Sequence, residues 1–212
     1  MSRGDLKAVL GVGVGVGILI QPILANNIPP QYAISFGLRC GVLVFFTLLA
    51  PFLLYVAKWL SRIFKGLYQF AQFCAVGTLN SFVDAGVFNL ETFFYGSTVS
   101  NTTFIFFKTI SFLCATTNSY VWNKYWTFSA REKPKASEVT AFYTVAIIGG
   151  FLNVGVATLV KISGPADSKI WVNIVSVLAG IAAAFLWDFF GYKHFVFKKH
   201  PVTNNAQTGS AQ

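Results

Sequence analysis

Residues 73–80 read Phe-Cys-Ala-Val-Gly-Thr-Leu-Asn and open a long apolar stretch, and residues 150–153 read Gly-Phe-Leu-Asn inside a second such stretch. Both stretches place an Asn three residues after a Gly. The segments that follow them also end alike, because residues 123–128 read Asn-Lys-Tyr-Trp-Thr-Phe and residues 192–197 read Tyr-Lys-His-Phe-Val-Phe. The region 68–199 is therefore predicted to hold two copies of a helical hairpin. Duplicated hairpins build membrane carriers whose site lies at the repeat interface.

The composition of the chain indicates an integral membrane protein. Of its 212 residues, 55% are hydrophobic and 11% are charged, whereas soluble domains average about 25% charged residues. The chain contains 23 Phe, which lipid-facing helices can accommodate. Its net charge of +9 comes from Lys and Arg that flank apolar stretches, so we expect membrane lipids, and no nucleic acid, as its surroundings.

Six stretches are long and apolar enough to cross a bilayer, which takes about 20 mainly apolar residues. The first has the basic start of a cleaved signal peptide, but cleavage after Ala25 would put the bulky Ile23 where a small residue is required, which favours a retained helix. The alternating glycines of residues 11–17 make two overlapping Gly-x-x-x-Gly spacings, which predict close helix contacts. The six stretches cover roughly residues 8–25, 36–57, 69–92, 104–122, 139–160 and 171–191.

The distribution of basic residues predicts the orientation of these spans. With the N-terminus in the cytoplasm, the cytoplasmic side receives twelve of the 16 Lys and Arg, and such an excess marks the inner side of a membrane. Both termini are therefore predicted to be cytoplasmic. The twelve residues are Arg3, Lys7, Lys58, Arg62, Lys65, Lys124, Arg131, Lys133, Lys135, Lys193, Lys198 and Lys199.

These patterns together predict an all-α integral membrane protein with about six transmembrane helices, of which the last four form two repeated helical hairpins. Residues 1–67 are predicted to form an N-terminal extension with two of the helices, and residues 68–199 a four-helix transmembrane domain. Residues 200–212 are polar and are predicted to be a disordered tail. We expect a multi-pass protein of the cell (inner) membrane.

Asp84 and Lys108 are charged residues within predicted spans, where a charge costs free energy. Asp84 lies about 15 residues into the third span, and Lys108 lies about five residues from the start of the fourth. On antiparallel neighbours, both then fall in the outer half of the membrane. We expect them to form an ion pair that contributes to a substrate site; the alternative is that the pair only holds the two helices together.

Asn80 and Asn153 occupy equivalent places in the two predicted hairpins. Their equivalence leads us to expect that they meet near a pseudo-symmetry axis. An Asn inside a span either hydrogen-bonds across helices or contacts a ligand, and the sequence leaves both roles open.

Two further polar groups lie at the predicted cytoplasmic ends of spans. Asn118, Asn123 and Lys124 end the fourth span, and Asp188 and Lys193 end the sixth. A Lys between aromatic residues at a membrane interface either anchors its helix by snorkelling or binds a lipid phosphate. Both roles stay open. If the lysines bind phosphate, they define together one anionic site that faces the cytoplasm, because they come from equivalent places in the repeat.

The sequence contains no pattern that predicts catalysis or a cofactor. It lacks the His-Glu-x-x-His, Gly-x-Ser-x-Gly and Walker patterns, and its segments outside the spans are too short for a catalytic domain. Cys40, Cys74 and Cys114 fall inside apolar stretches, where Cys behaves as a small hydrophobic residue. We therefore expect no enzyme, no cofactor, no metal site and no disulfide.

The motifs of residues 68–199 resemble those of the GtrA-like family of small membrane proteins. The resemblance departs from the family in two ways: Lys124 stands where the family usually has Arg, and two extra spans precede the four that the family typically has. The matching motifs are Phe73-x-x-Val76-Gly77-x-x-Asn80, Lys108-x-Ile-Ser111-Phe112, Asn123-Lys-Tyr-Trp126-Thr-Phe128, Gly150-x-x-Asn153 and Lys193-His-Phe-Val-Phe197.

The resemblance implies a role in cell-surface polysaccharide synthesis, in which the protein moves a polyprenyl-phosphate-linked sugar across the membrane. The phosphate is then expected at Lys124 and Lys193, and the sugar along Asn80, Asp84, Lys108 and Asn153. A second reading is a non-transporting anchor or activator of a polyprenyl-phosphate glycosyltransferase, and a third is a small-ion or drug carrier. The expected partners are the lipid-linked sugar, a glycosyltransferase of the same pathway and, from the small size of the chain, a second copy of itself.

Overall fold

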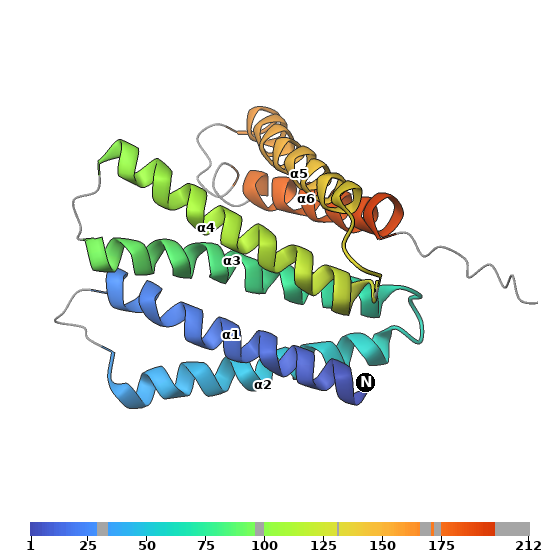
Figure 1. Ribbon diagram of the computed structural model, residues 1–212, viewed down its shortest axis with the longest axis horizontal. Helices are drawn as coiled ribbons and strands as arrows, with labels where there is room; N and C mark the ends of the chain where they lie inside the picture. Colours follow the sequence, from blue (N-terminus) through green and yellow to red (C-terminus); the bar gives the residue numbers. More distant parts are fainter. Residues whose placement is uncertain (29–33, 96–99, 131, 166–170, 172–174, 198–212) are drawn as a thin grey trace, which may run out of the picture. The chain divides into compact units, whose positions relative to one another are not determined.

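The computed structural model describes residues 1–28, 34–95, 100–130, 132–165, 171 and 175–197, and every element in these ranges is helical (Figure 1). The all-α prediction is confirmed for them; the predicted tail lies outside the described residues. The chain divides into two compact units, Met1–Arg131 and Glu132–Gln212. The elements are α1 (Arg3–Asn27), α2 (Phe36–Leu60), α3 (Leu67–Tyr95), α4 (Asn101–Trp122), η2 (Asn123–Thr127), α5 (Ala136–Ile162), α6 (Ser176–Gly191) and η4 (Tyr192–Val196).

Four of the described helices are long and apolar enough to cross a membrane, namely α1, α2, α3 and α5. Each of them offers at least the roughly 20 residues that the hydrocarbon core requires. The helices α4, with 22 residues, and α6, with 16 described residues, do not meet the same criteria of length and hydropathy.

The first unit holds α1 to α4, in which α1 contacts both α2 and α3, and α3 contacts α4. In Figure 1 these four helices run side by side. Val12 and Val16 of α1 and Leu79 of α3 are almost fully buried and form the centre of the core. The N-terminal extension therefore folds against α3 and forms one compact unit with the first hairpin.

The alternating glycines of α1 bring the helices of this unit into close contact, as their spacing predicts. A Cβ added at Gly13 would lie 2.5 Å from the carbonyl oxygen of Phe46, and one at Gly17 would lie 2.9 Å from the Cα of Leu43, so both glycines face the backbone of α2. Gly15 faces α3 instead, where a Cβ would lie 2.9 Å from the side chain of Leu79. Small residues permit this approach in membranes, where van der Waals packing drives helix association.

The second unit is built on the contact between α5 and α6. Phe142 of α5 is fully buried and stacks on Tyr192, with the ring centroids 4.4 Å apart. Trp187 of α6 donates a hydrogen bond from Nε1 to the carbonyl oxygen of Val145 at 3.0 Å. Gly191 faces the side chain of Val145, which leaves no room for a Cβ and holds the two helices close together.

Both hairpins end in a π-helical turn. The helix α4 continues into η2, where Phe128 donates its backbone N–H to the carbonyl oxygen of Asn123 at 2.9 Å. The helix α6 continues into η4, where Phe197 donates to Tyr192 at 2.8 Å. These bonds span five residues, and π turns are rare and often lie at functional sites. The two endings that the sequence predicts to be equivalent thus share one helical form.

Candidate functional site

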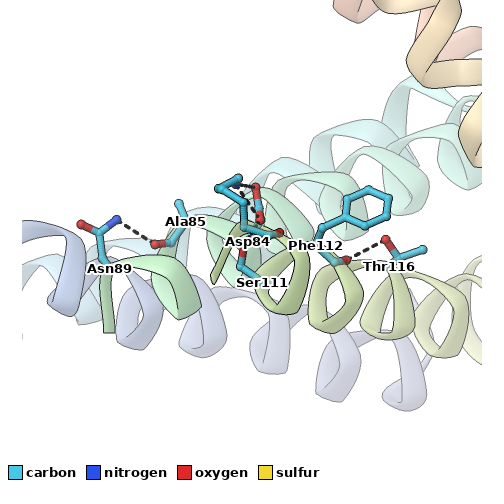
Figure 2. A network of polar contacts seen from close by, with 7 residues as sticks. Asp84, Ala85, Asn89, Ser111, Phe112 and Thr116 are labelled. Atoms are coloured by element: carbon cyan, nitrogen blue, oxygen red, sulfur yellow. Dashed lines mark hydrogen bonds and ion pairs between the residues drawn. The ribbon is translucent and has the colours of Figure 1, made fainter. Parts of the chain in front are cut away.

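Asp84 of α3 and Lys108 of α4 form the predicted ion pair. Lys108 Nζ donates to both carboxylate oxygens of Asp84, at 2.8 and 3.0 Å. Ser111 of α4 donates its hydroxyl to Oδ1 of the same carboxylate at 2.6 Å, and Figure 2 shows Asp84 beside Ser111. The side chains of Lys108 and Asp84 remain 40% and 35% exposed, so a ligand can reach the pair.

The position of this pair follows from helix periodicity. Lys108 and Ser111 are three residues apart on α4 and therefore lie on the same face of that helix. Asp84 bonds to both side chains, so a single carboxylate connects the two helices. The ring of Phe88, one turn further along α3, lies 5.4 Å from Lys108 Nζ and provides a cation–π contact.

Asn80 and Asn118 form a second connection between α3 and α4. The side-chain nitrogen of Asn118 donates to Oδ1 of Asn80 at 2.6 Å. Asn80 precedes Asp84 by one helical turn, so the two polar contacts lie next to each other along the same pair of helices. Of the two roles that the sequence leaves open for Asn80, the structure thus contains the hydrogen bond across helices, with Asn118 as the partner.

Replacing Asn118 by Ala is expected to lower the free energy of unfolding by about 1 kcal/mol, because Asn80 loses its partner across the helices. The measurement is a denaturation titration of the purified protein in lipid. The control is Thr109→Ala, since the Thr109 hydroxyl is exposed and bonds to the carbonyl oxygen of Ile105 on its own helix. Equal effects of the two substitutions would show that the contact between Asn80 and Asn118 adds no stability.

Two glutamines continue these contacts towards the start of α3. Gln72 donates from Nε2 to Oδ1 of Asp5 in α1 at 3.3 Å. Gln69 donates from Nε2 to the carbonyl oxygen of Thr127 in η2 at 3.1 Å. The indole of Trp126 donates to the same Oδ1 of Asp5 at 3.2 Å, so α1, α3 and η2 are joined at one point.

We call Gln69, Gln72, Asn80 and Asp84 the polar row, because each links α3 to another helix through its side chain. Their spacings of three, eight and four residues are sums of three and four, so all four lie on one face of α3. At 1.5 Å per residue the row is about 22 Å long. Gln69, Gln72 and Asp5 are not among the residues predicted from the sequence, although the helical spacing of the two glutamines to Asn80 was a usable signal.

Asn153 and Asp188 lie at the contact between α5 and α6 in the second unit. The backbone of Gly180 lies against Asn153, and the backbone of Gly149 lies against the carboxylate of Asp188. The Oδ1 atom of Asp188 is buried and has no hydrogen-bond partner among the described residues. Polar groups without a partner inside a membrane protein are costly and mark functional sites.

The two lysines of the predicted phosphate site lie in different surroundings. Lys124 is fully buried, with Nζ 5.9 Å from the ring centroids of Tyr120 and of Tyr125. Its neighbour Asn123 is 1% exposed and donates from Nδ2 to the hydroxyl of Ser119 at 3.2 Å. Lys193 is exposed, with Nζ 5.7 Å from the ring centroid of Phe189. Snorkelling to water therefore does not describe Lys124, whereas Lys193 is directly open to an anion.

The predicted site residues fall into two groups that follow the two units. The first unit brings together Asp84 with Lys108 and Asn80 with Asn118, and it buries the adjacent pair Asn123 and Lys124. The second unit contains Asn153, Asp188 and Lys193. The meeting of Asn80 with Asn153, and a common site of the two lysines, stay predictions. Within the described ranges, no cluster of three His, Cys, Asp or Glu side chains is arranged to hold a metal ion.

Comparison with known proteins gives this arrangement a family. The family description "GtrA/DPMS, transmembrane domain" matches residues 72–197, which is more than half of the chain. The chain is also 28% identical over 126 residues to "Uncharacterized membrane protein YngA" of Bacillus subtilis (strain 168), a match that covers 59% of this chain and 77% of that protein. No solved structure matches the chain with significance. The chain is thus an integral, multi-pass membrane protein that belongs to the GtrA/DPMS transmembrane-domain family.

Proposed function

We propose that this protein moves a polyprenyl-phosphate-linked monosaccharide across the cell membrane for the synthesis of cell-surface polysaccharide. The polar row of α3 is the observation that carries the proposal, since it supplies hydrogen-bonding groups along about 22 Å of a helix that is long and apolar enough to cross a membrane. The family of the chain supports a substrate related to polyprenyl-phosphate sugars. In this role the protein is non-catalytic.

The chemistry of the polar row suits a sugar. A monosaccharide offers hydroxyl groups that both donate and accept hydrogen bonds, and the row offers amides, a carboxylate and the ammonium group of Lys108. Asp84 and Lys108 are partly exposed. Sugar hydroxyls can therefore reach them and replace the hydrogen bonds that the two side chains make to each other. The prenyl chain of the substrate stays in the lipid, where it meets the exposed phenylalanines of the helices, such as Phe93, Phe106 and Phe112.

The proposal includes a topology of six membrane spans with both termini in the cytoplasm, in which α4 and α6 also cross. The shared π-helical ends of α4 and α6 support the grouping of α3 to α6 into two equivalent hairpins. Those ends then face the cytoplasm and hold Lys124 and Lys193. The exposure of Lys193 makes it the first contact for the phosphate of an arriving lipid, which it binds as a point charge.

The test is a leaflet-exchange assay with the purified protein in liposomes and a labelled polyprenyl-phosphate sugar. Protein-dependent exchange is expected, with a loss of about tenfold in Lys193→Ala, because an exposed charge-assisted contact to phosphate contributes about 1.5 kcal/mol. The two single variants, Lys193→Ala and Lys124→Ala, and the double variant are compared. Together they separate the contribution of the exposed lysine to exchange from that of the buried one.

The matched control for Lys193→Ala is Lys161→Ala, which removes an exposed lysine from the last turn of α5, at the predicted outer side. Lys161→Ala should leave exchange unchanged. If the protein gives no exchange but still binds a glycosyltransferase of the pathway, it acts as an anchor or activator subunit and the translocase proposal is wrong. If the protein gives no exchange of the sugar lipid but carries a small ion or drug against a proton gradient, and Asp84→Asn uncouples this movement, the carrier reading replaces the first one.

A further inference from the structure

A cavity of ≈ 510 Å³ lies between the start of α1 and the end of α4 with its π turn η2. This volume falls in the range of about 300–1,000 Å³ that is usual for small-molecule sites. Ser2, Asp5 and Ala8 contribute from the side of α1, and Trp122, Tyr125 and Trp126 contribute from the opposite side. The α1 residues precede the region that matches the family, residues 72–197, so the N-terminal extension completes this cavity.

The side chains of the cavity have the chemistry of a sugar site. The aromatic rings of Trp122, Tyr125 and Trp126 offer flat apolar faces for the C–H face of a pyranose ring. Asp5 offers a carboxylate, and Ser2 and Ser129 offer hydroxyls at the rim. The lining contains no Lys, Arg or His, and the charge of Asp5 repels a phosphate. The cavity therefore favours an uncharged ring with hydroxyl groups over an anion.

The cavity is held in shape before any ligand arrives. The carboxylate of Asp5 is fixed on one side by the backbone N–H of Ser2 at 3.1 Å, and on the other side by Gln72 and Trp126. The indole rings of Trp122 and Trp126 lie 5.7 Å apart at 74° and form a corner. A site whose side chains are already positioned loses little entropy when the ligand binds.

We infer that this cavity binds the monosaccharide ring of the lipid-linked sugar and so distinguishes it from the bare prenyl phosphate. This inference rests on the proposed function and adds a headgroup site to it, at the opposite end of the polar row from Asp84. Gln72 belongs both to the polar row and, through its bond to Asp5, to the support of the cavity. The cavity then holds the sugar at the end of the row from which transport begins.

The test compares two phosphodiesters of equal charge for binding to the full chain in lipid nanodiscs: citronellyl phosphate glucose, and citronellyl methyl phosphate, which has a methyl group in place of the sugar. The mannose and galactose derivatives extend the series. The intact protein is expected to bind the sugar-bearing probe more tightly than citronellyl methyl phosphate. Tyr125→Ala is expected to reduce this ratio about fivefold, because one stacking surface is lost. Tyr125 is about half exposed, so its removal leaves the core intact.

The matched control is Tyr55→Ala, which removes a tyrosine of similar exposure from α2 and outside the cavity. It should leave the ratio unchanged. The second variant is Asp5→Asn, which keeps the shape of the side chain and removes its charge. It should also lower the ratio.

Three results would overturn the inference. An unchanged ratio in both cavity variants, with sugar-lipid binding intact, places the sugar elsewhere and leaves the proposed function standing. Stronger binding of both probes by Asp5→Asn, with an unchanged ratio, identifies a phosphate site in the cavity. A failure of the intact protein to bind any sugar-bearing probe removes both the cavity assignment and the proposed function.

Discussion

Replacing Gly13 by Leu is expected to abolish the contact between α1 and α2 and to lower the free energy of unfolding by about 3 kcal/mol or more. The added Cβ alone would lie 2.5 Å from the carbonyl oxygen of Phe46 and 2.9 Å from the Cα of Thr47. Both atoms belong to the backbone of α2, so no side-chain rotation can relieve the overlap. The two helices must separate, and the packing around Val12 and Val16 separates with them.

The measurement for Gly13→Leu is thermal unfolding of the purified protein in lipid, where a loss of this size lowers the Tm by about 6–12 °C. The matched control is Gly41→Leu on α2, since a Cβ at Gly41 meets no atom within 4 Å. A normal Tm for Gly13→Leu would mean that α1 and α2 do not approach at Gly13. An equal loss in both variants would show that leucine itself, and not the helix contact, lowers stability.

Replacing Asp84 by Leu is expected to lower the free energy of unfolding by about 2 kcal/mol, because it leaves Lys108 of α4 without its carboxylate partner. Breaking a fully buried pair costs about 3–5 kcal/mol, and we reduce this range because the two side chains are 35% and 40% exposed. The double variant Asp84→Leu/Lys108→Leu is expected to recover about 1 kcal/mol of the loss, since no charge is then left alone.

The two single variants and the double variant form a cycle that is measured by denaturant unfolding in lipid. If the two single losses add up to the loss in the double variant, the ion pair makes no energetic contribution. The same double variant also separates the two roles of the pair in the leaflet-exchange assay. If it is stable but inactive, the pair belongs to the transport path; if it is stable and active, the pair only holds α3 to α4.

The sequence was sufficient to predict the contacts that depend on helical spacing and on chemically matched partners. The pairing of Asp84 with Lys108 followed from two opposite charges at similar depth on neighbouring spans, where each charge has few other partners. The close contacts of α1 followed from Gly-x-x-x-Gly spacing. A charge within a span and a glycine repeat each tolerate few kinds of neighbour. In both cases the spacing of these residues in the sequence is therefore enough to predict the contact.

The sequence was not sufficient where the surroundings depend on which helices come together. Asp5 looks like a helix-capping residue, because it bonds Ser2 in the first turn of α1. Its bonds to Gln72 and Trp126 depend on the packing of α1 against α3, which the spacing of residues in α1 does not encode. Lys124 and Lys193 stand in motifs that look alike. The burial of Lys124 and the exposure of Lys193 could not be predicted from these motifs, because both depend on helix packing.

The π-helical turns at the ends of α4 and α6 would allow the backbone hydrogen bonds there to shift by one residue without breaking the helix. A π turn holds one more residue than the α-helical turn that would replace it. Converting η2 to α-helical bonding would rotate the following chain by about 100° and shift it by about 1.5 Å along the axis, while each N–H exchanges one carbonyl acceptor for the next. The residues after Thr127 would then face another direction, and each backbone N–H would keep an acceptor. Because η2 and η4 share this geometry, the same change of direction would be open to the ends of both hairpins.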